Sequence, residues 1–144
     1  MTARPGSRPI LVAEDSDEDF YALSRAFGRL APEARIDRAG DGDEALARLA
    51  GDHGYGLLVL DLNLPGTDGR EVLATLKRAQ PDGWALPVIV LSSSAAPQDV
   101  TGAYRDGANA YVRKALRPDD YERSIAALKS FWLDAVVLPA DCDD

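Results

Sequence analysis

Residues 57–66 read LLVLDLNLPG, and this stretch decides the fold. Its first four residues are apolar without interruption, and Asp61 follows them directly. A short continuous apolar run is typical of a strand buried on both faces of a parallel sheet. Ligands of such sheets bind beyond the carboxyl ends of the strands, so the position of Asp61 predicts that it faces a functional site.

Four further short runs accompany this strand, at residues 9–13 (PILVA), 35–39 (RIDRA), 87–91 (PVIVL) and 109–112 (NAYV). The run RIDRA alternates polar and apolar residues, which indicates an edge strand. Helix-patterned stretches separate the runs, with start signals at Asp41, Pro97 and Pro118 and a stop signal at Gly107. Strands that alternate with helices predict an α/β fold, a doubly wound five-stranded parallel sheet with helices on both faces.

Composition excludes several classes of protein. The 144 residues suffice for one domain, and 46% hydrophobic with 28% charged residues is typical of a globular protein. A net charge of −8 disfavours binding to nucleic acid or to an anionic membrane, and no apolar run reaches the length of a membrane span. Cys142 has no partner for a disulfide, and with His53 it provides too few soft ligands for zinc. We expect a cytoplasmic, acidic protein.

Polar residues follow four of the five predicted strands. They are Glu14 and Asp15, Asp61, Ser92 and, after one intervening residue, Lys114. Each alone is explained by helix capping or by surface exposure, and Asp15 or Ser16 can cap the first helix. As a set, however, three carboxylates would repel one another without a cation. Together with one ammonium they leave two negative charges, which one Mg²⁺ neutralises. A carboxylate beside Mg²⁺ and a lysine can act as a nucleophile on a phosphoryl group, and Asp61 is the central candidate.

The chain divides into a loose tail at residues 1–8, a domain at 9–134 and a C-terminal extension at 135–144 with an acidic end. The last helix presents an apolar stripe at helical spacing, formed by Tyr121, Ile125, Leu128 and Trp132. Apolar residues past this helix have no place in a five-stranded core and are typical of an interface. We therefore expect a homodimer with twofold symmetry. Its candidate residues are Phe131, Trp132, Val136, Val137 and Leu138.

Four segments resemble the receiver domain of two-component response regulators: ILVAEDSDED, LLVLDLNLPGTDGREVL, PVIVLSSS and GANAYVRK. The resemblance covers residues 8–134 and implies a flavodoxin-like fold with strand order 2-1-3-4-5. It implies that Asp61 accepts phosphate from a sensor kinase histidine. Asp15 would ligate Mg²⁺ directly, Glu14 through water and Asn63 through its main-chain carbonyl.

The same resemblance implies a phosphorylation switch and no metabolic enzyme. Ser92 would be the switch hydroxyl, with Ser93 beside it, and Lys114 would pair with the phosphoryl group. Tyr111 would be the aromatic residue that turns inward on activation. Asn63 and Ser94 would influence the water that hydrolyses the acyl phosphate.

Two segments, DLNLPGTDGREVL and SFWLDAVVLP, are similar to the stand-alone response regulators that partner phytochrome histidine kinases. This implies a red-light-sensing kinase as phosphodonor and a homodimer built partly by the C-terminal segment. With no output domain after residue 144, a partner protein or a phosphorelay would receive the signal, and the sequence identifies neither.

Ala115 departs from the pattern of this family, in which a cis proline follows the lysine. A cis bond before a non-proline residue costs roughly 2.5–4 kcal/mol. Either the loop keeps the cis bond under strain, or the bond is trans and Lys114 moves. Two alternatives remain: a receiver-like docking module that is not phosphorylated, and an aspartate-nucleophile phosphatase. The phosphatase is disfavoured because Asn63 stands where its general acid would be.

Overall fold

The computed structural model describes residues 8–79 and 86–137. Five strands form one parallel sheet in the order β2-β1-β3-β4-β5. Their bounds are β1 Ile10–Ala13, β2 Ile36–Ala39, β3 Leu57–Leu60, β4 Val88–Ser92 and β5 Ala110–Arg113. The predicted doubly wound sheet and its strand order are therefore confirmed.

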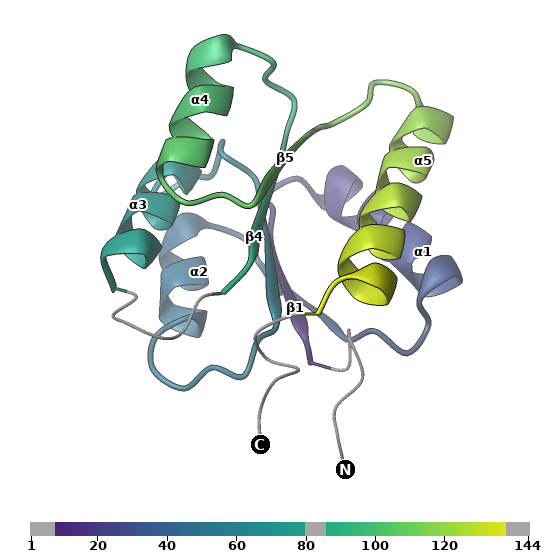
Figure 1. The fold of residues 1–144 in the computed structure, drawn as a ribbon, viewed down its shortest axis with the longest axis horizontal. Helices are drawn as coiled ribbons and strands as arrows, with labels where there is room; N and C mark the ends of the chain where they lie inside the picture. Colours follow the sequence, from purple (N-terminus) through teal and green to yellow (C-terminus); the bar gives the residue numbers. More distant parts are fainter. Residues whose placement is uncertain (1–7, 80–85, 138–144) are drawn as a thin grey trace.

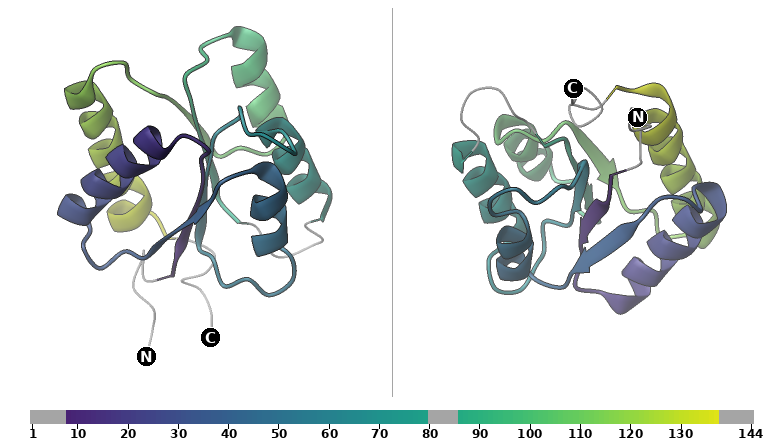
Figure 2. Two further views of the ribbon diagram at one scale, coloured as in Figure 1. Left: turned by 180° about the vertical axis from the view of Figure 1, so that it is seen from behind. Right: turned by 90° about the horizontal axis from the view of Figure 1, so that it is seen from below.

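Five α-helices cover the two faces of the sheet (Figures 1 and 2). One face carries α1 and α5, and the other carries α2, α3 and α4. Their bounds are α1 Asp17–Leu30, α2 Gly42–Arg48, α3 Gly69–Ala79, α4 Pro97–Arg105 and α5 Pro118–Lys129, and a π-helical turn over Ser130–Ala135 continues α5. The loops after β4 and β5 lie at the upper edge of Figure 1, which is the carboxyl edge of the sheet.

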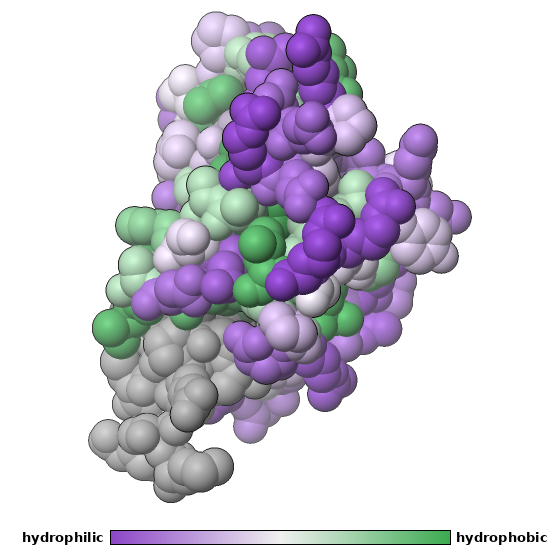
Figure 3. Space-filling model, turned by 90° about the vertical axis from the view of Figure 1, so that its right-hand side faces the viewer, coloured by the Kyte–Doolittle hydropathy of each residue, from purple (hydrophilic) through white to green (hydrophobic). Residues whose placement is uncertain are grey.

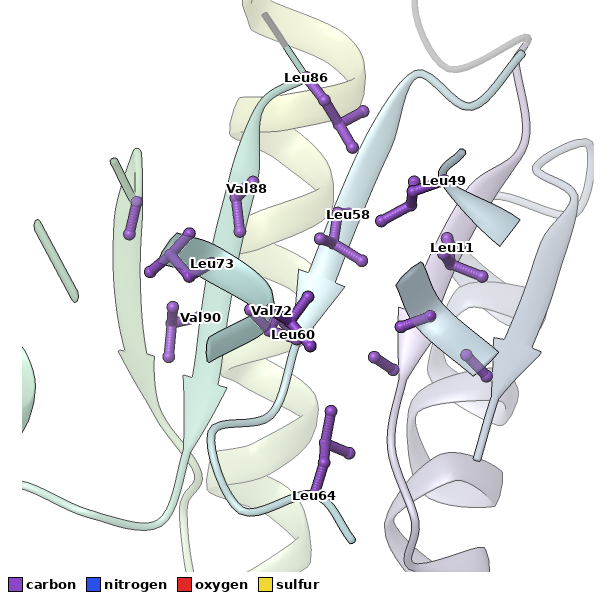
Figure 4. Packing of buried hydrophobic residues seen from close by; sticks show 14 of the residues in the cluster. Leu11, Leu49, Leu58, Leu60, Leu64, Val72, Leu73, Leu86, Val88 and Val90 are labelled. Carbon is purple, nitrogen blue, oxygen red and sulfur yellow. The ribbon is translucent and has the colours of Figure 1, made fainter. Parts of the chain in front are cut away.

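The continuous apolar runs are explained by burial on both faces. Successive side chains of a strand point to opposite faces. Leu58 and Leu60 of β3 accordingly pack with Val72 of α3 on one face, where Figure 4 shows strand and helix side chains converging. Leu57 and Val59 pack with the helices of the other face. A polar residue within such a strand would be buried on either side.

The start and stop signals of the helices act as the sequence predicts. Ser16 caps α1, because its Oγ accepts a hydrogen bond from the Asp19 N–H at 3.2 Å. Asp41 caps α2 through the Glu44 N–H at 2.7 Å. Pro97 and Pro118 open α4 and α5, and Gly107 follows α4 with a φ of 104°, which favours glycine.

The strand bounds and the last helix differ in detail from the sequence-based expectation. All strands except β3 begin one residue later than predicted, and β4 and β5 also end one residue later. On the last helix Leu133, and not Trp132, is the buried continuation of the apolar stripe, while Trp132 is half-buried. The π-helical turn explains this, because its i→i+5 bonds insert an extra residue and shift the stripe by one position.

The surface over α1 and α5 is mostly hydrophilic, with smaller hydrophobic areas between the charged groups (Figure 3). Phe131 is 54% exposed and Val137 is 74% exposed, whereas Val136 is half-buried. Leu138 and residues 1–7 of the predicted tail lie outside the described residues. Within residues 8–79 and 86–137, no helix combines the length and apolar character needed to cross a bilayer.

Candidate functional site

The sheet itself brings the predicted site residues together. The Asp61 N–H donates to the Ala13 carbonyl at 3.0 Å, and the Lys114 N–H donates to the Ser92 carbonyl at 2.7 Å. These backbone bonds align the carboxyl ends of β1 with β3 and of β4 with β5, and the pairing of β3 with β4 completes the edge. Glu14, Asp61 and Lys114 therefore meet in one pocket, although they are far apart in the sequence.

The ammonium group of Lys114 is the centre of this pocket. Its Nζ lies 2.6 Å from Glu14 Oε1, 2.9 Å from Asp19 Oδ2 and 3.0 Å from Asp61 Oδ2. A lysine has three N–H donors, so these contacts use all of them. The side chains of Glu14, Asp61 and Lys114 are only 5%, 8% and 11% exposed, whereas that of Asp19 is 43% exposed.

The peptide bond after Lys114 is trans, since the described part of the chain contains no cis bond. Of the two backbone forms considered for the Lys114–Ala115 bond, the structure therefore has the trans form. Lys114 nevertheless reaches Asp61. Ala115 itself packs against the core on the α1 and α5 side.

Burial is the largest influence on the pKa of Glu14. It raises the pKa of Glu14 to about 7, the charge of Asp61 adds to the rise, and Lys114 opposes it. Burial lowers the pKa of Lys114, but its bonds to Glu14 and Asp19 outweigh this and hold the pKa above its usual value. Lys114 therefore stays charged near neutral pH, whereas Glu14 titrates there.

This shift predicts a pH-dependent stability. Between pH 4.5 and 7 the folded protein binds more protons at Glu14 than the unfolded chain does, so stability falls as pH rises. With metal chelated, the free energy of unfolding should drop by on the order of 2 kcal/mol between pH 5 and pH 8. Urea unfolding at several pH values measures it, and Glu14→Gln should flatten the curve. An equally steep curve in that variant would assign the effect to other groups.

Glu14, Asp15 and Asp61 form a candidate metal site. Each offers one carboxylate oxygen, and these oxygens lie within 4.8 Å of one another. Asp15 is exposed, and the Asn63 N–H donates to Asp61 Oδ1 at 3.0 Å. Carboxylate oxygens are the ligands that Mg²⁺ and related divalent cations prefer. The donor set thus fits such an ion.

The predicted switch residues Ser92 and Tyr111 are both hydrogen-bonded to Ser94 in the loop after β4. Ser92 is fully buried, and its Oγ accepts a hydrogen bond from the Ser94 N–H at 3.2 Å, while Ser93 is exposed. The Tyr111 hydroxyl donates to the Ser94 carbonyl at 2.9 Å, and the Ser94 hydroxyl donates to Asp99 at 2.6 Å. The loop after β4 is thus tied both to β5 and to α4.

Sequence reasoning missed Asp19 and Arg38. The Arg38 guanidinium donates to the carbonyls of Glu14 at 3.0 Å and Asp15 at 3.2 Å, and it pairs with Asp17 at 2.7 Å. Nothing in RIDRA marks Arg38, because a charged residue on an edge strand is already explained by exposure to solvent. Asp19 lies in the first turn of α1, where an acidic residue is already explained by the helix dipole.

The sequence was compared with protein families and with curated proteins. The sequence matches the response regulator receiver domain over residues 10–126. It is 37% identical over 129 residues to the "Probable methanogenesis regulatory protein FilR2" of Methanothrix harundinacea, covering 86% of this chain and 83% of that protein. It is 36% identical over 137 residues to the response regulator Rcp1 of Synechocystis, covering 91% of this chain and 92% of Rcp1.

Solved structures agree with the sequence matches. The Mn²⁺-bound form of Rcp1 has a TM-score of 0.84 at 35% identity and covers 92% of this chain and 99% of that chain. The phosphorylated cyanobacterial phytochrome response regulator RcpA has a TM-score of 0.84 at 31% identity and covers 95% of this chain and 99% of that chain.

Proposed function

Because this chain belongs to the response regulator receiver domain family, whose members are signalling proteins and not metabolic enzymes, we propose that Asp61 accepts a phosphoryl group from a sensor histidine kinase. The observation that supports this most directly is the pairing of the buried Asp61 carboxylate with the Lys114 ammonium at 3.0 Å, inside a carboxylate cluster that fits a divalent cation. Glu14, Asp15 and Asp61 would hold Mg²⁺, with the main-chain carbonyl of Asn63.

The proposed transfer needs a nucleophile and charge neutralisation. An Asp61 oxygen attacks the phosphorus of a phosphohistidine, the P–N bond breaks, and the imidazole nitrogen leaves with the electron pair and is protonated. Mg²⁺, when bound, neutralises charge on the phosphoryl oxygens. Lys114 supplies a second positive charge because its ammonium already lies against Asp61. Water attack on the same phosphorus returns the carboxylate and inorganic phosphate, and Asn63 and Ser94 flank that attack.

The switch would act through the loop after β4. Ser92 and Ser93 would bind the new phosphoryl oxygens. The hydrogen bond that the Ser94 N–H donates to the Ser92 hydroxyl would then break. Ser94 is the residue to which the Tyr111 hydroxyl donates, so a change at Ser92 reaches Tyr111 through one residue. The face of α4 and β5 would then change its affinity for a partner protein.

The proposed phosphodonor is a phytochrome-type kinase. RcpA, which is named a phytochrome response regulator, is 31% identical to this chain and matches nearly all of it. The test is phosphotransfer from such a kinase, autophosphorylated and purified, to the full chain. We expect the phytochrome-type kinase to transfer its phosphoryl group within the dead time of mixing. An unrelated histidine kinase should transfer its phosphoryl group slowly. Equal rates with both kinases would contradict the pairing.

We also propose that residues 131–138 contribute to a homodimer. Phe131 and Val137 are large exposed apolar side chains at the end of the last helix, which is typical of an interface. Phe131→Glu combined with Val137→Asp should convert a dimer to a monomer at tens of micromolar, measured by sedimentation. Leu116, which is 94% exposed in another loop, offers a matched control, and Leu116→Asp should leave the dimer intact. A wild type that sediments as a monomer, with and without phosphorylation, contradicts the proposal.

The experiment that tests the function as a whole is intact mass after incubation with acetyl phosphate. With Mg²⁺ the protein should gain the mass of one phosphoryl group, and with chelator it should gain none. No uptake despite metal binding would leave the receiver fold with a docking role and overturn the proposed function.

A further inference from the structure

We infer that Asp19 is a positioning residue that keeps the Lys114 ammonium at the pocket once a divalent cation occupies the carboxylate cluster. This inference rests on the proposed function of the same site. It starts from the three contacts of Lys114, which lie within 0.4 Å of one another in length. Only one of the three carboxylates, Asp19, lies outside the candidate metal cluster.

The other two carboxylates that contact Lys114 also belong to the candidate metal site. Glu14 and Asp61 each offer an oxygen to the metal cluster, and each also contacts Lys114. A dication bound by these carboxylates weakens their attraction for the ammonium and repels it directly. The contact between Lys114 and Asp19 at 2.9 Å is then the remaining ion pair that holds the side chain in place.

Asp19 is itself fixed well enough for this role. Its backbone N–H donates to Ser16 Oγ, the N-cap of α1, so the first turn of the helix sets its position. Its side chain is partly exposed, at 43%, which leaves it outside the buried core of the pocket. A charge-assisted hydrogen bond of this kind is stronger than a neutral one. Lys114 is thus held by a contact to α1 in addition to its position directly after β5.

The variants separate this role from a simple effect of charge. Asp19→Asn removes the carboxylate, and Asp19→Glu keeps it on a longer stem. Glu18→Gln is the matched control, because Glu18 is exposed on the same helical turn and its loss removes the same charge. At saturating Mg²⁺, Asp19→Asn should slow phosphorylation by acetyl phosphate about tenfold. Asp19→Glu should restore most of the rate, and Glu18→Gln should leave it unchanged.

A second readout does not depend on phosphorylation. The chain has only three lysines, Lys77, Lys114 and Lys129, so the ¹⁵N ammonium spectrum is simple to assign. The Lys114 signal should stay protected from water exchange in the wild type with and without Mg²⁺. In Asp19→Asn it should be protected without Mg²⁺ and lost when Mg²⁺ is added.

The outcomes distinguish the inference from the proposed function. A wild type that takes up no phosphate overturns the proposed function, while the ammonium spectrum still tests Asp19. A Lys114 signal that survives Mg²⁺ in Asp19→Asn overturns the inference even if the wild type is phosphorylated. The same conclusion follows if Asp19→Asn reacts as fast as Glu18→Gln. Faster phosphorylation of Asp19→Asn would show that Asp19 restrains Lys114 instead of positioning it.

Discussion

Asp61→Asn should abolish phosphorylation by acetyl phosphate and Mg²⁺, with no gain in intact mass under conditions that convert the wild type. The amide lacks the negative charge that makes the carboxylate a nucleophile, and its nitrogen is not a substitute. The variant also loses one of the carboxylates that fit a divalent cation. The expected effect is therefore total loss and not a reduction in rate.

The fold of this variant should be preserved. Asp61 attracts Lys114 at 3.0 Å, but its charge also raises the pKa of Glu14, so its removal loses one favourable contact and relieves one repulsion. We expect these two effects to offset each other, so the variant should still unfold cooperatively at pH 8. Phosphate that appears in the variant and maps to the exposed Asp15 would show that the pocket accepts phosphate at a second carboxylate.

Gly69→Ala should destabilise the protein by about 3 kcal/mol, because there is no room for a methyl group. A Cβ at this position would lie 2.2 Å from the Asp61 carbonyl oxygen and 2.7 Å from Leu62 Cα. Both neighbours are backbone, so no side-chain rotation relieves the clash. The Gly69 N–H also donates to the Leu62 carbonyl at 3.0 Å, which holds the start of α3 against the backbone that follows Asp61.

The same substitution should slow phosphorylation, since the backbone of Asp61 must shift to admit the methyl group. Urea unfolding and intact mass on one sample measure both effects. Gly28→Ala is the control, because an added Cβ there would meet no atom within 4 Å beyond the nearby backbone of α1 itself. Its free energy of unfolding should rise by about 0.5–1 kcal/mol. A variant Gly69→Ala that unfolds like the wild type would mean that the loop after β3 yields at little cost.

The residues at strand ends could be predicted because two local signals combine. An apolar run ends at a polar residue, and parallel strands align their carboxyl ends, so Glu14, Asp61 and Lys114 converge without any knowledge of long-range contacts. Asp19 could not be found in this way. Its partner Lys114 is 95 residues away, and an acid in the first turn of a helix already has a local explanation.

Packing details were predictable only as far as the helix stays regular. The stripe through Tyr121, Ile125 and Leu128 is buried as its spacing predicts, but the next buried residue is Leu133. The π-helical turn changes the spacing of buried residues there, and no residue type in SFWLDA predicts such a turn. The trans bond at Ala115, by contrast, is what the residue pair alone favours, because a cis bond before a non-proline residue costs roughly 2.5–4 kcal/mol.

The guanidinium of Arg38 gives the acidic loop a shape of its own. From the edge strand β2 it donates hydrogen bonds to the carbonyls of Glu14 and Asp15. It also lies 4.9 Å from the centre of the Phe20 ring. The backbone that presents the acidic pair is therefore preorganised: an arriving ion meets a frame that is already assembled and has little chain entropy to remove. A divalent cation held by this cluster would then exchange with solvent without unfolding the loop that binds it.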